Sequence, residues 1–168
     1  MKKRRARLAS TQKWRRELVA WLSAFGLVVL LAGCSQAVHK TVFAHSGGGE
    51  KTTLAFYTKG RSDHVDKQVT TLDIDMAKVM GKSDAKTLDR GWHVMQADAQ
   101  AHAKLHGVKA TVARSGKMVH EVVTVDTAKV DFGKLAKVDG QALAGKTDHI
   151  SLDNVTHTLK QDGYQEVK

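Results

Sequence analysis

The chain contains one cysteine, Cys34, and the residues before it give that thiol a specific chemistry. Leu31, Ala32 and Gly33 precede it at the end of an apolar run, which is the pattern of a bacterial lipobox. In such a pattern the leader is cut before the cysteine and the thiol carries a lipid. Two acyl chains, at about 0.8 kcal/mol per buried methylene, make the attachment to a bilayer effectively permanent. The sequence therefore predicts Cys34 as a lipidation site rather than a redox or disulfide cysteine.

The nine histidines form the second group with useful chemistry. His102 and His106 are four residues apart on a predicted helix, so both side chains could reach one zinc ion. A zinc site needs three or four convergent ligands, and this spacing supplies only two. Most of the other histidines are expected to be surface residues or partly buried aromatic residues. Zinc binding at His102 and His106 is therefore the alternative hypothesis, and the main expectation is that no cofactor is bound.

Other reactive combinations are weak. Asp73 and Asp75 lie two residues apart and would share one face of a strand, where two carboxylates could do acid–base work or bind calcium. A solvated strand face, or the approach to a turn, explains the same pair. The sequence lacks the Gly-x-Ser-x-Gly pattern of a nucleophile elbow. We therefore expect a protein without enzymatic activity.

The segment before Cys34 has the composition of a signal peptide. Residues 1–17 hold eight lysine or arginine residues and one acid, and residues 18–32 carry no charge. These 15 apolar and small residues are fewer than the roughly 20 that a membrane-spanning helix needs. An uncleaved membrane anchor, with Cys34 as an ordinary residue, is the competing interpretation. We expect a lipid-anchored protein on the extracytoplasmic face of the cell membrane.

The domain limits follow from this cut. Residues 1–33 are the predicted lipoprotein signal peptide, residues 34–49 hold the lipidated cysteine, a short spacer and the first strand, and residues 50–168 complete a single domain. The formal charge of +10 belongs mostly to the leader, because residues 34–168 carry 19 basic and 16 acidic residues. This small surplus does not favour nucleic acid as a partner.

The hydropathy and turn patterns predict a β-rich domain. Residues 41–45 and 53–57 alternate in polarity around a glycine cluster and predict a hairpin. Residues 65–74 predict a third strand, and residues 108–114 and 117–125 predict a second hairpin around Gly116. A helix from Ser83 or Asp84 to His106, with Ser83 as a reasonable N-cap, is expected to cover the sheet. Short helices are predicted over residues 130–138 and after Ser151. The predicted fold class is α+β: an antiparallel sheet of about five strands, with two main helices packed on one face.

Four short motifs then appear in a recognisable order. They are Tyr57-Thr58-Lys59-Gly60, Val65-Asp66-Lys67-Gln68, Thr124-Val125-Asp126 and Leu159-Lys160-Gln161-Asp162-Gly163-Tyr164. Following a lipobox, this order resembles the YehR-like family of small bacterial lipoproteins over nearly all of the mature domain. The resemblance implies an α+β fold and an unknown molecular function, and it carries over no catalytic or binding residue. Tyr164 stands where the family usually has Phe, and Thr127 where an aromatic residue is common.

Two functional hypotheses follow. The first is a non-enzymatic binding or envelope-maintenance module, held at the membrane by its lipid, with an unknown protein or small molecule as ligand. The second is a histidine-dependent metal-binding lipoprotein. An exposed apolar groove favours the first, and convergence of His102 and His106 with a third ligand favours the second.

Overall fold

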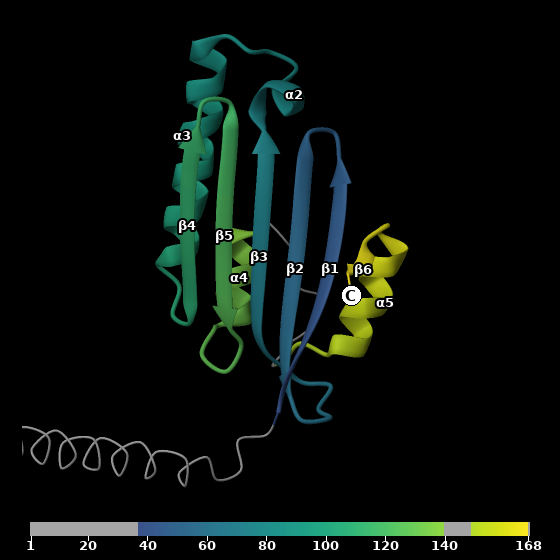
Figure 1. Cartoon of the computed structure of the whole chain (residues 1–168). Coiled ribbons are helices and arrows are strands. Elements are labelled where there is room, and N and C mark those ends of the chain that lie inside the picture. The colour runs from purple at the N-terminus through teal and green to yellow at the C-terminus, as the bar shows by residue number, and fades with distance from the viewer. Residues whose placement is uncertain (1–36, 140–148, 168) are drawn as a thin grey trace, which may run out of the picture. The chain divides into compact units, whose positions relative to one another are not determined.

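A computed structural model describes residues 37–139 and 149–167 (Figure 1). Six strands form one antiparallel sheet in the order β4-β5-β3-β2-β1-β6. The strands are β1 (Val38–Gly47), β2 (Glu50–Lys59), β3 (Val65–Asp75), β4 (Val108–Ser115), β5 (Met118–Asp126) and β6 (Gln165–Val167). The predicted signal peptide and its lipobox residues Leu31, Ala32, Gly33 and Cys34 lie outside the described residues.

Both predicted hairpins are confirmed. β1 and β2 pair from Val38↔Lys59 to Gly47↔Glu50, and β4 and β5 pair from Val108↔Val125 to Ser115↔Met118. The glycines in these turns have positive φ, as at Gly116 with φ 60°, a conformation that glycine adopts without a steric penalty. β3 joins the two hairpins, because it pairs with β2 on one side and β5 on the other.

β6 makes the sheet six-stranded, where the sequence predicted about five strands. Gly163, with φ 85°, turns the chain back after the last helix, and Gln165 then pairs with Ala44 of β1. Three residues are too few to show an alternating pattern, so only the pairing partner reveals this strand. The predicted α+β class is confirmed.

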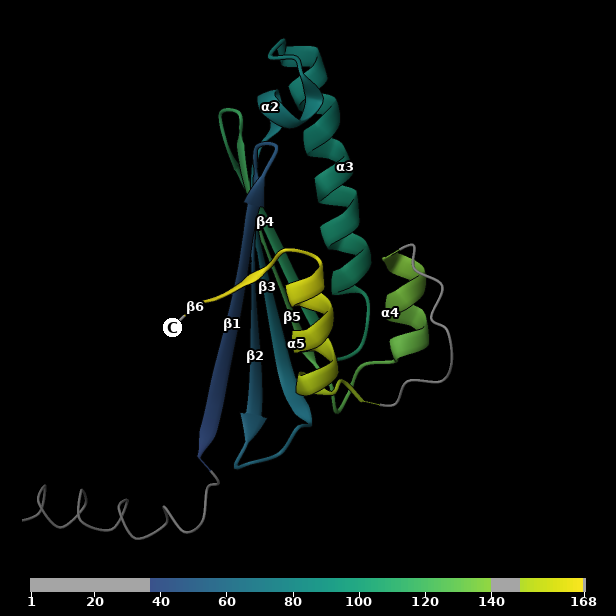
Figure 2. The same cartoon turned by 90° about the vertical axis from the view of Figure 1, so that its right-hand side faces the viewer.

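The helices cover one face of the sheet (Figure 2). They are α2 (Met76–Met80), α3 (Ala85–Ala103), α4 (Phe132–Val138) and α5 (Leu152–Gln161). Each begins at a side-chain cap: Asp75, Asp84, Asp131 and Ser151 accept a hydrogen bond from a backbone N–H of the first turn. The predicted cap at Ser151 is confirmed. None of the described helices is long and apolar enough to cross a membrane.

α3 is shorter than the sequence predicted. Asp84, rather than Ser83, is its N-cap, since its carboxylate accepts a hydrogen bond from Thr87 N at 2.9 Å. The helix ends at Ala103, three residues before His106. Gly107, with φ 78°, then packs so closely that an added Cβ would lie 2.8 Å from Lys129 Cβ and 2.9 Å from Val130 N. This tight turn feeds β4 back along the sheet.

The predicted apolar stripe of α3 is confirmed, with Leu88, Ala99 and His102 buried. Gly91 lies inside this stripe and faces α2. A Cβ there would lie 2.8 Å from the Met80 sulfur and 3.1 Å from the Met76 sulfur, so the two methionine side chains of α2 pack closely against this glycine.

The core lies between the helices and the sheet in three clusters. The largest side chain with no exposed surface is Phe43, which packs against Phe56 and Val65 beneath α5. Val119 and Ile74 pack beneath α3 and α2, and Val108 and Val125 pack beneath α4. A cleft described below is lined by residues of the Phe43 cluster, Leu54 and Phe56, and of the Val108 cluster, Phe132 and Leu135.

Candidate functional site

Among the histidines that the structure describes, His102 is the one that is buried, and carboxyl groups lie around its ring. It lies in the last turn of α3 with 7% of its surface exposed. Nε2 is 2.7 Å from Oδ1 of Asp139, which caps the end of α4. Nδ1 is 3.1 Å from the Asp98 carbonyl oxygen and 3.4 Å from Asp98 Oδ2. A carbonyl oxygen and ionised carboxylate oxygens act as acceptors, so this arrangement favours a protonated His102 ring with both nitrogens donating.

Glu121 of β5 completes the group. It faces the helices, has 5% of its surface exposed, and its Oε1 has no hydrogen-bond partner among the described residues. One ligand atom from each of Asp98, His102 and Glu121 lies within 4.8 Å of the other two. We call these three residues, together with Asp139, the His102 cluster. His102 and Glu121 are buried, whereas the Asp98 and Asp139 side chains are 46% and 35% exposed.

Burial and hydrogen bonds act in opposite directions on the titration of this cluster. Burial lowers the pKa of His102, but the hydrogen bonds to Asp139 and to the Asp98 backbone, with the charges of both aspartates, outweigh it and raise the pKa above 6.5. Burial raises the pKa of Glu121, and the negative charge of Asp98 raises it further. The fold therefore makes both His102 and Glu121 weaker acids than they are in an unfolded chain.

We expect the free energy of unfolding to fall as the pH rises from about 6 to about 8. The pKa of folded His102 lies above its ordinary value, so the folded state binds more protons than the unfolded state in this interval. The raised pKa of Glu121 acts in the same direction from about pH 4.5 upward. Urea unfolding at a series of pH values measures the slope. His102→Gln should flatten it, whereas His106→Gln, outside the cluster, should not; stability that rises with pH over this range would contradict the assignment.

Beside the cluster lies an apolar cleft of about 430 Å³ between α4, α5 and the sheet. Its floor is formed by Leu54, Phe56 and Gln68. Its walls are formed by residues of α4, of α5 and of the chain before α5: Phe132, Leu135, Ala136, Ile150, Asn154, Val155, Thr158 and Leu159. Asp139 belongs both to the cleft and to the His102 cluster. The volume is in the range of small-molecule sites, and most of the lining is apolar with a few polar side chains.

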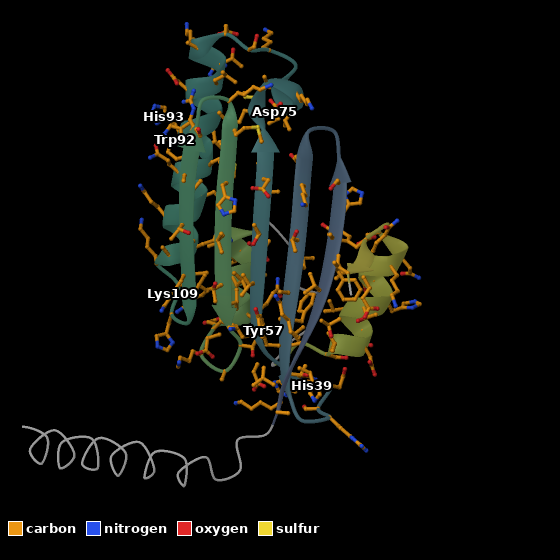
Figure 3. All side chains as sticks on the ribbon, in the orientation of Figure 1. His39, Tyr57, Asp75, Trp92, His93 and Lys109 are labelled. Carbon is orange, nitrogen blue, oxygen red and sulfur yellow. The ribbon has the colours of Figure 1, made fainter. Side chains whose placement is uncertain are left out.

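The predicted partner of His102 lies elsewhere. Because α3 ends at Ala103, His106 follows the helix, and its Nδ1 is 3.0 Å from the Lys129 carbonyl oxygen. His106 is not among the grouped ligand atoms found in the described residues. Of the other histidines, His64 and His149 lie together, with ring centroids 5.0 Å apart, whereas His39 and His93 lie at opposite ends of the sheet (Figure 3). Metal binding by His102 and His106 stays a prediction, and the geometry offers His102 different neighbours.

Comparison with known proteins places the chain in a family. A family described as "Protein of unknown function (DUF1307)" matches residues 40–165. The chain belongs to the DUF1307 family. The uncharacterized lipoprotein YehR of Escherichia coli K12 is 25% identical over 154 residues, which cover 90% of this chain and 97% of YehR. The uncharacterized lipoprotein Lin0239 of Listeria innocua is 25% identical over 143 residues, covering 84% and 90%.

Two solved structures share the fold. The NMR structure of E. coli YehR matches with a TM-score of 0.66 and 21% identity, covering 80% of this chain and 94% of that one. The NMR structure of a Streptococcus pneumoniae TIGR4 protein matches with a TM-score of 0.54 and 11% identity, covering 80% and 88%. The predicted resemblance of this DUF1307 protein to the YehR-like family is thus confirmed.

Sequence reasoning about this DUF1307 protein missed Asp98, Glu121 and Asp139. Glu121 could have been recognised from the sequence, because it lies on the same strand face as Val119 and Val125, and an acidic residue is rare on a buried apolar face. Asp98 is four residues before His102 and could have been found from helical spacing. Asp139 had no signal, since it approaches His102 across 37 residues of sequence.

The paired acids Asp73 and Asp75 contact different partners in this DUF1307 protein. Asp73 Oδ1 is 2.6 Å from Nδ1 of His120, on the face of the sheet opposite the helices. Asp75 caps α2 and forms an ion pair with Lys117 at 2.9 Å. The Lys117 hydrogen bond is the largest influence on Asp75 and lowers the pKa of its carboxyl. The two carboxylates therefore have separate structural partners.

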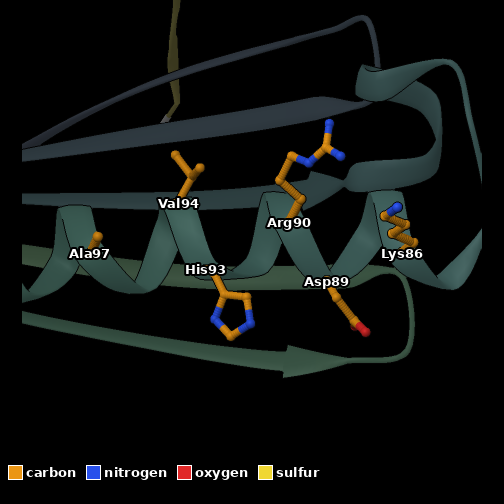
Figure 4. A pocket seen from close by; sticks show the side chains of 6 residues that line it. All are labelled: Lys86, Asp89, Arg90, His93, Val94 and Ala97. Atoms are coloured by element: carbon orange, nitrogen blue, oxygen red, sulfur yellow. The ribbon is translucent and has the colours of Figure 1, made fainter.

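A further hollow runs along α3 (Figure 4). It is lined by Lys86, Asp89, Arg90, His93, Val94 and Ala97, with Asp89 and His93 on one side and Arg90 and Val94 on the other. Asp89 is already paired with Arg114 at 2.7 Å. Because one helix supplies all six residues, the hollow has a single wall and cannot enclose a ligand.

Proposed function

We propose that this DUF1307 protein is a lipid-anchored extracytoplasmic lipoprotein that binds a small, mainly apolar molecule in the cleft between α4 and α5. The observation that supports binding is the cleft itself. Its 430 Å³ suits a small molecule, and its apolar surface is interrupted by a few polar side chains that would orient the ligand: Gln68, Asn154, Thr158 and Asp139. A small molecule with an apolar body and a hydrogen-bonding end fits this lining.

The anchor is supported by two independent observations. Leu31-Ala32-Gly33-Cys34 ends an apolar segment behind a basic start, as in lipoprotein signal peptides. Both YehR and Lin0239, which match over most of the mature domain, are named lipoproteins. Three residues, Ser35, Gln36 and Ala37, separate Cys34 from the start of β1 in the sequence.

We propose that the cleft binds its ligand without catalysing a reaction. Among the described residues that line the cleft, the polar groups are two amides, one hydroxyl and one carboxylate. Thr158 Oγ1 donates to the Asn154 carbonyl oxygen, and Asp139 is held by His102. A nucleophile next to a general base, the arrangement that covalent catalysis needs, is not found in this lining. These groups support recognition and not turnover.

We expect Thr158→Trp to block the cleft. Thr158 lines the cleft and is exposed, so an indole there fills the space without overpacking the core. Titration with the neutral fluorescent probe N-phenyl-1-naphthylamine should show saturable binding by the unmodified protein and at least tenfold weaker binding by Thr158→Trp.

His157→Trp is the matched control, because His157 is the adjacent exposed residue of α5 and does not line the cleft. It should bind the probe as the unmodified protein does. Equal binding by Thr158→Trp, or a lack of saturation in the unmodified protein, would refute the cleft as a ligand site.

A further inference from the structure

We propose that Asp98, His102 and Glu121 bind a divalent transition-metal ion of the zinc class, and that Asp139 fixes the His102 ring for this purpose. The site differs from the predicted His102–His106 pair in two of its three ligands. None of these three ligands lines the apolar cleft, and the two sites share only Asp139.

The spacing of the ligand atoms suits such an ion. Two tetrahedral ligands at about 2.1 Å from zinc lie about 3.4 Å apart. His102 Nδ1 and Asp98 Oδ2 are already 3.4 Å apart. One ligand atom from each of Asp98, His102 and Glu121 lies within 4.8 Å of the other two. Small side-chain rotations bring the three atoms around one ion. The Asp98 side chain is 46% exposed, so the ion has a route in from solvent.

The second observation is Glu121 Oε1. A buried carboxylate oxygen without a partner is costly, and such atoms in native proteins require an explanation. A protonated His102 ring supplies positive charge to the cluster, but its two N–H groups already donate to Asp98 and Asp139 and not to Glu121. A bound cation would give Oε1 the partner that the described side chains do not provide.

Asp139 has the position of an outer-shell residue. Metal-ligating histidines commonly donate their second ring N–H to a carboxylate, which fixes the ring and makes it a better ligand. Here Nε2–H donates to Asp139 Oδ1 at 2.7 Å, which leaves Nδ1 to face the ion. Binding replaces the Nδ1 proton: His102 loses H⁺ to solvent, and the Nδ1 lone pair forms the bond to the metal.

The ligand types select the ion class. Magnesium and calcium prefer an all-oxygen shell, whereas imidazole together with carboxylates suits zinc and its neighbours. Once His102 has released its Nδ1 proton, the ionised carboxylates of the His102 cluster lose their neighbouring positive charge. A divalent ion replaces that charge.

The test is calorimetric titration of the chelator-treated full chain in detergent with Zn²⁺, and visible absorption with Co²⁺ as a reporter of the ligand shell. We expect one site with a Kd on the order of 10 µM or tighter. Glu121→Gln and Asp98→Asn should each weaken binding at least tenfold. Asp139→Asn should weaken it 10- to 100-fold, as outer-shell changes do.

The controls separate this site from surface histidines. His106→Gln and His120→Gln should leave the affinity unchanged, because neither belongs to the cluster. Titration at about pH 6 in buffers of different ionisation enthalpy should show the release of about one proton per ion from His102. Asp98→Asn keeps the test valid if Glu121→Gln fails to fold, since Asp98 is half exposed. Undiminished affinity in the Asp98 and Glu121 variants, or no site tighter than tens of micromolar in the unmodified chain, would overturn the proposal, whatever the cleft binds.

Discussion

Cys34→Ala is expected to abolish incorporation of labelled fatty acid into the protein. In the proposed anchor the lipid is attached through the Cys34 thiol, and the sequence has no second cysteine that could take it. Without the cysteine the cut before residue 34 is also lost, so residues 1–33 should remain attached. Metabolic labelling of intact cells and intact-mass spectrometry measure the two effects separately.

Ser35→Ala is the matched control, because it changes the adjacent residue and leaves the thiol in place. It should be labelled and cut like the unmodified protein. The anchor assignment fails if the unmodified protein retains residues 1–33 and carries a bare thiol. This outcome would leave the cleft and the metal proposal untouched, because both depend on the folded domain alone.

Phe43→Ala is expected to reduce the free energy of unfolding by about 3–5 kcal/mol. Phe43 has no exposed surface, and its ring meets that of Phe56 edge-on, with centroids 6.2 Å apart. Truncation leaves a cavity beneath α5 and removes this aromatic contact. Small domains have only about 5–15 kcal/mol of stability in total, so a single change here should shift the urea midpoint strongly.

Val38→Ala in the same strand provides the comparison. Val38 is 62% exposed, so its replacement should change the free energy of unfolding by no more than about 0.5 kcal/mol. Equilibrium unfolding in urea, followed by circular dichroism, measures both variants. A loss below about 1 kcal/mol for Phe43→Ala would contradict the packing of α5 against β1 and β2.

Both proposed sites lie on the face of the sheet that the helices cover. α3 packs over one half of this face and α5 over the other, and the cleft and the His102 cluster lie on the same face. This arrangement depends on α4, which supplies both cleft-lining residues and Asp139 at its C-cap. Thr158→Trp therefore acts on the cleft and Glu121→Gln on the metal site, whereas Asp139→Asn affects both.

The sequence by itself determined the local elements of this protein. Glycine-containing turns such as Gly116 separate alternating strands, and Ser151 begins a helix, because these signals act within a few residues of the chain. The lipobox prediction likewise rests on four adjacent residues. The same local rules left the end of α3 open, since the turn at Gly107 is set by Lys129 and Val130, more than twenty residues away.

Only the tertiary structure decided how these elements combine. β3 pairs with β5 through contacts such as Leu72↔Glu121, and two helices and a strand separate the two in sequence. Periodicity shows that Glu121 faces inward, but not that His102 and Asp98 lie above it, because that depends on how α3 crosses the sheet. The same holds for Gly91, whose neighbours are the methionines of α2. Side chains distant in sequence form a site only when the packing of the whole domain brings them together.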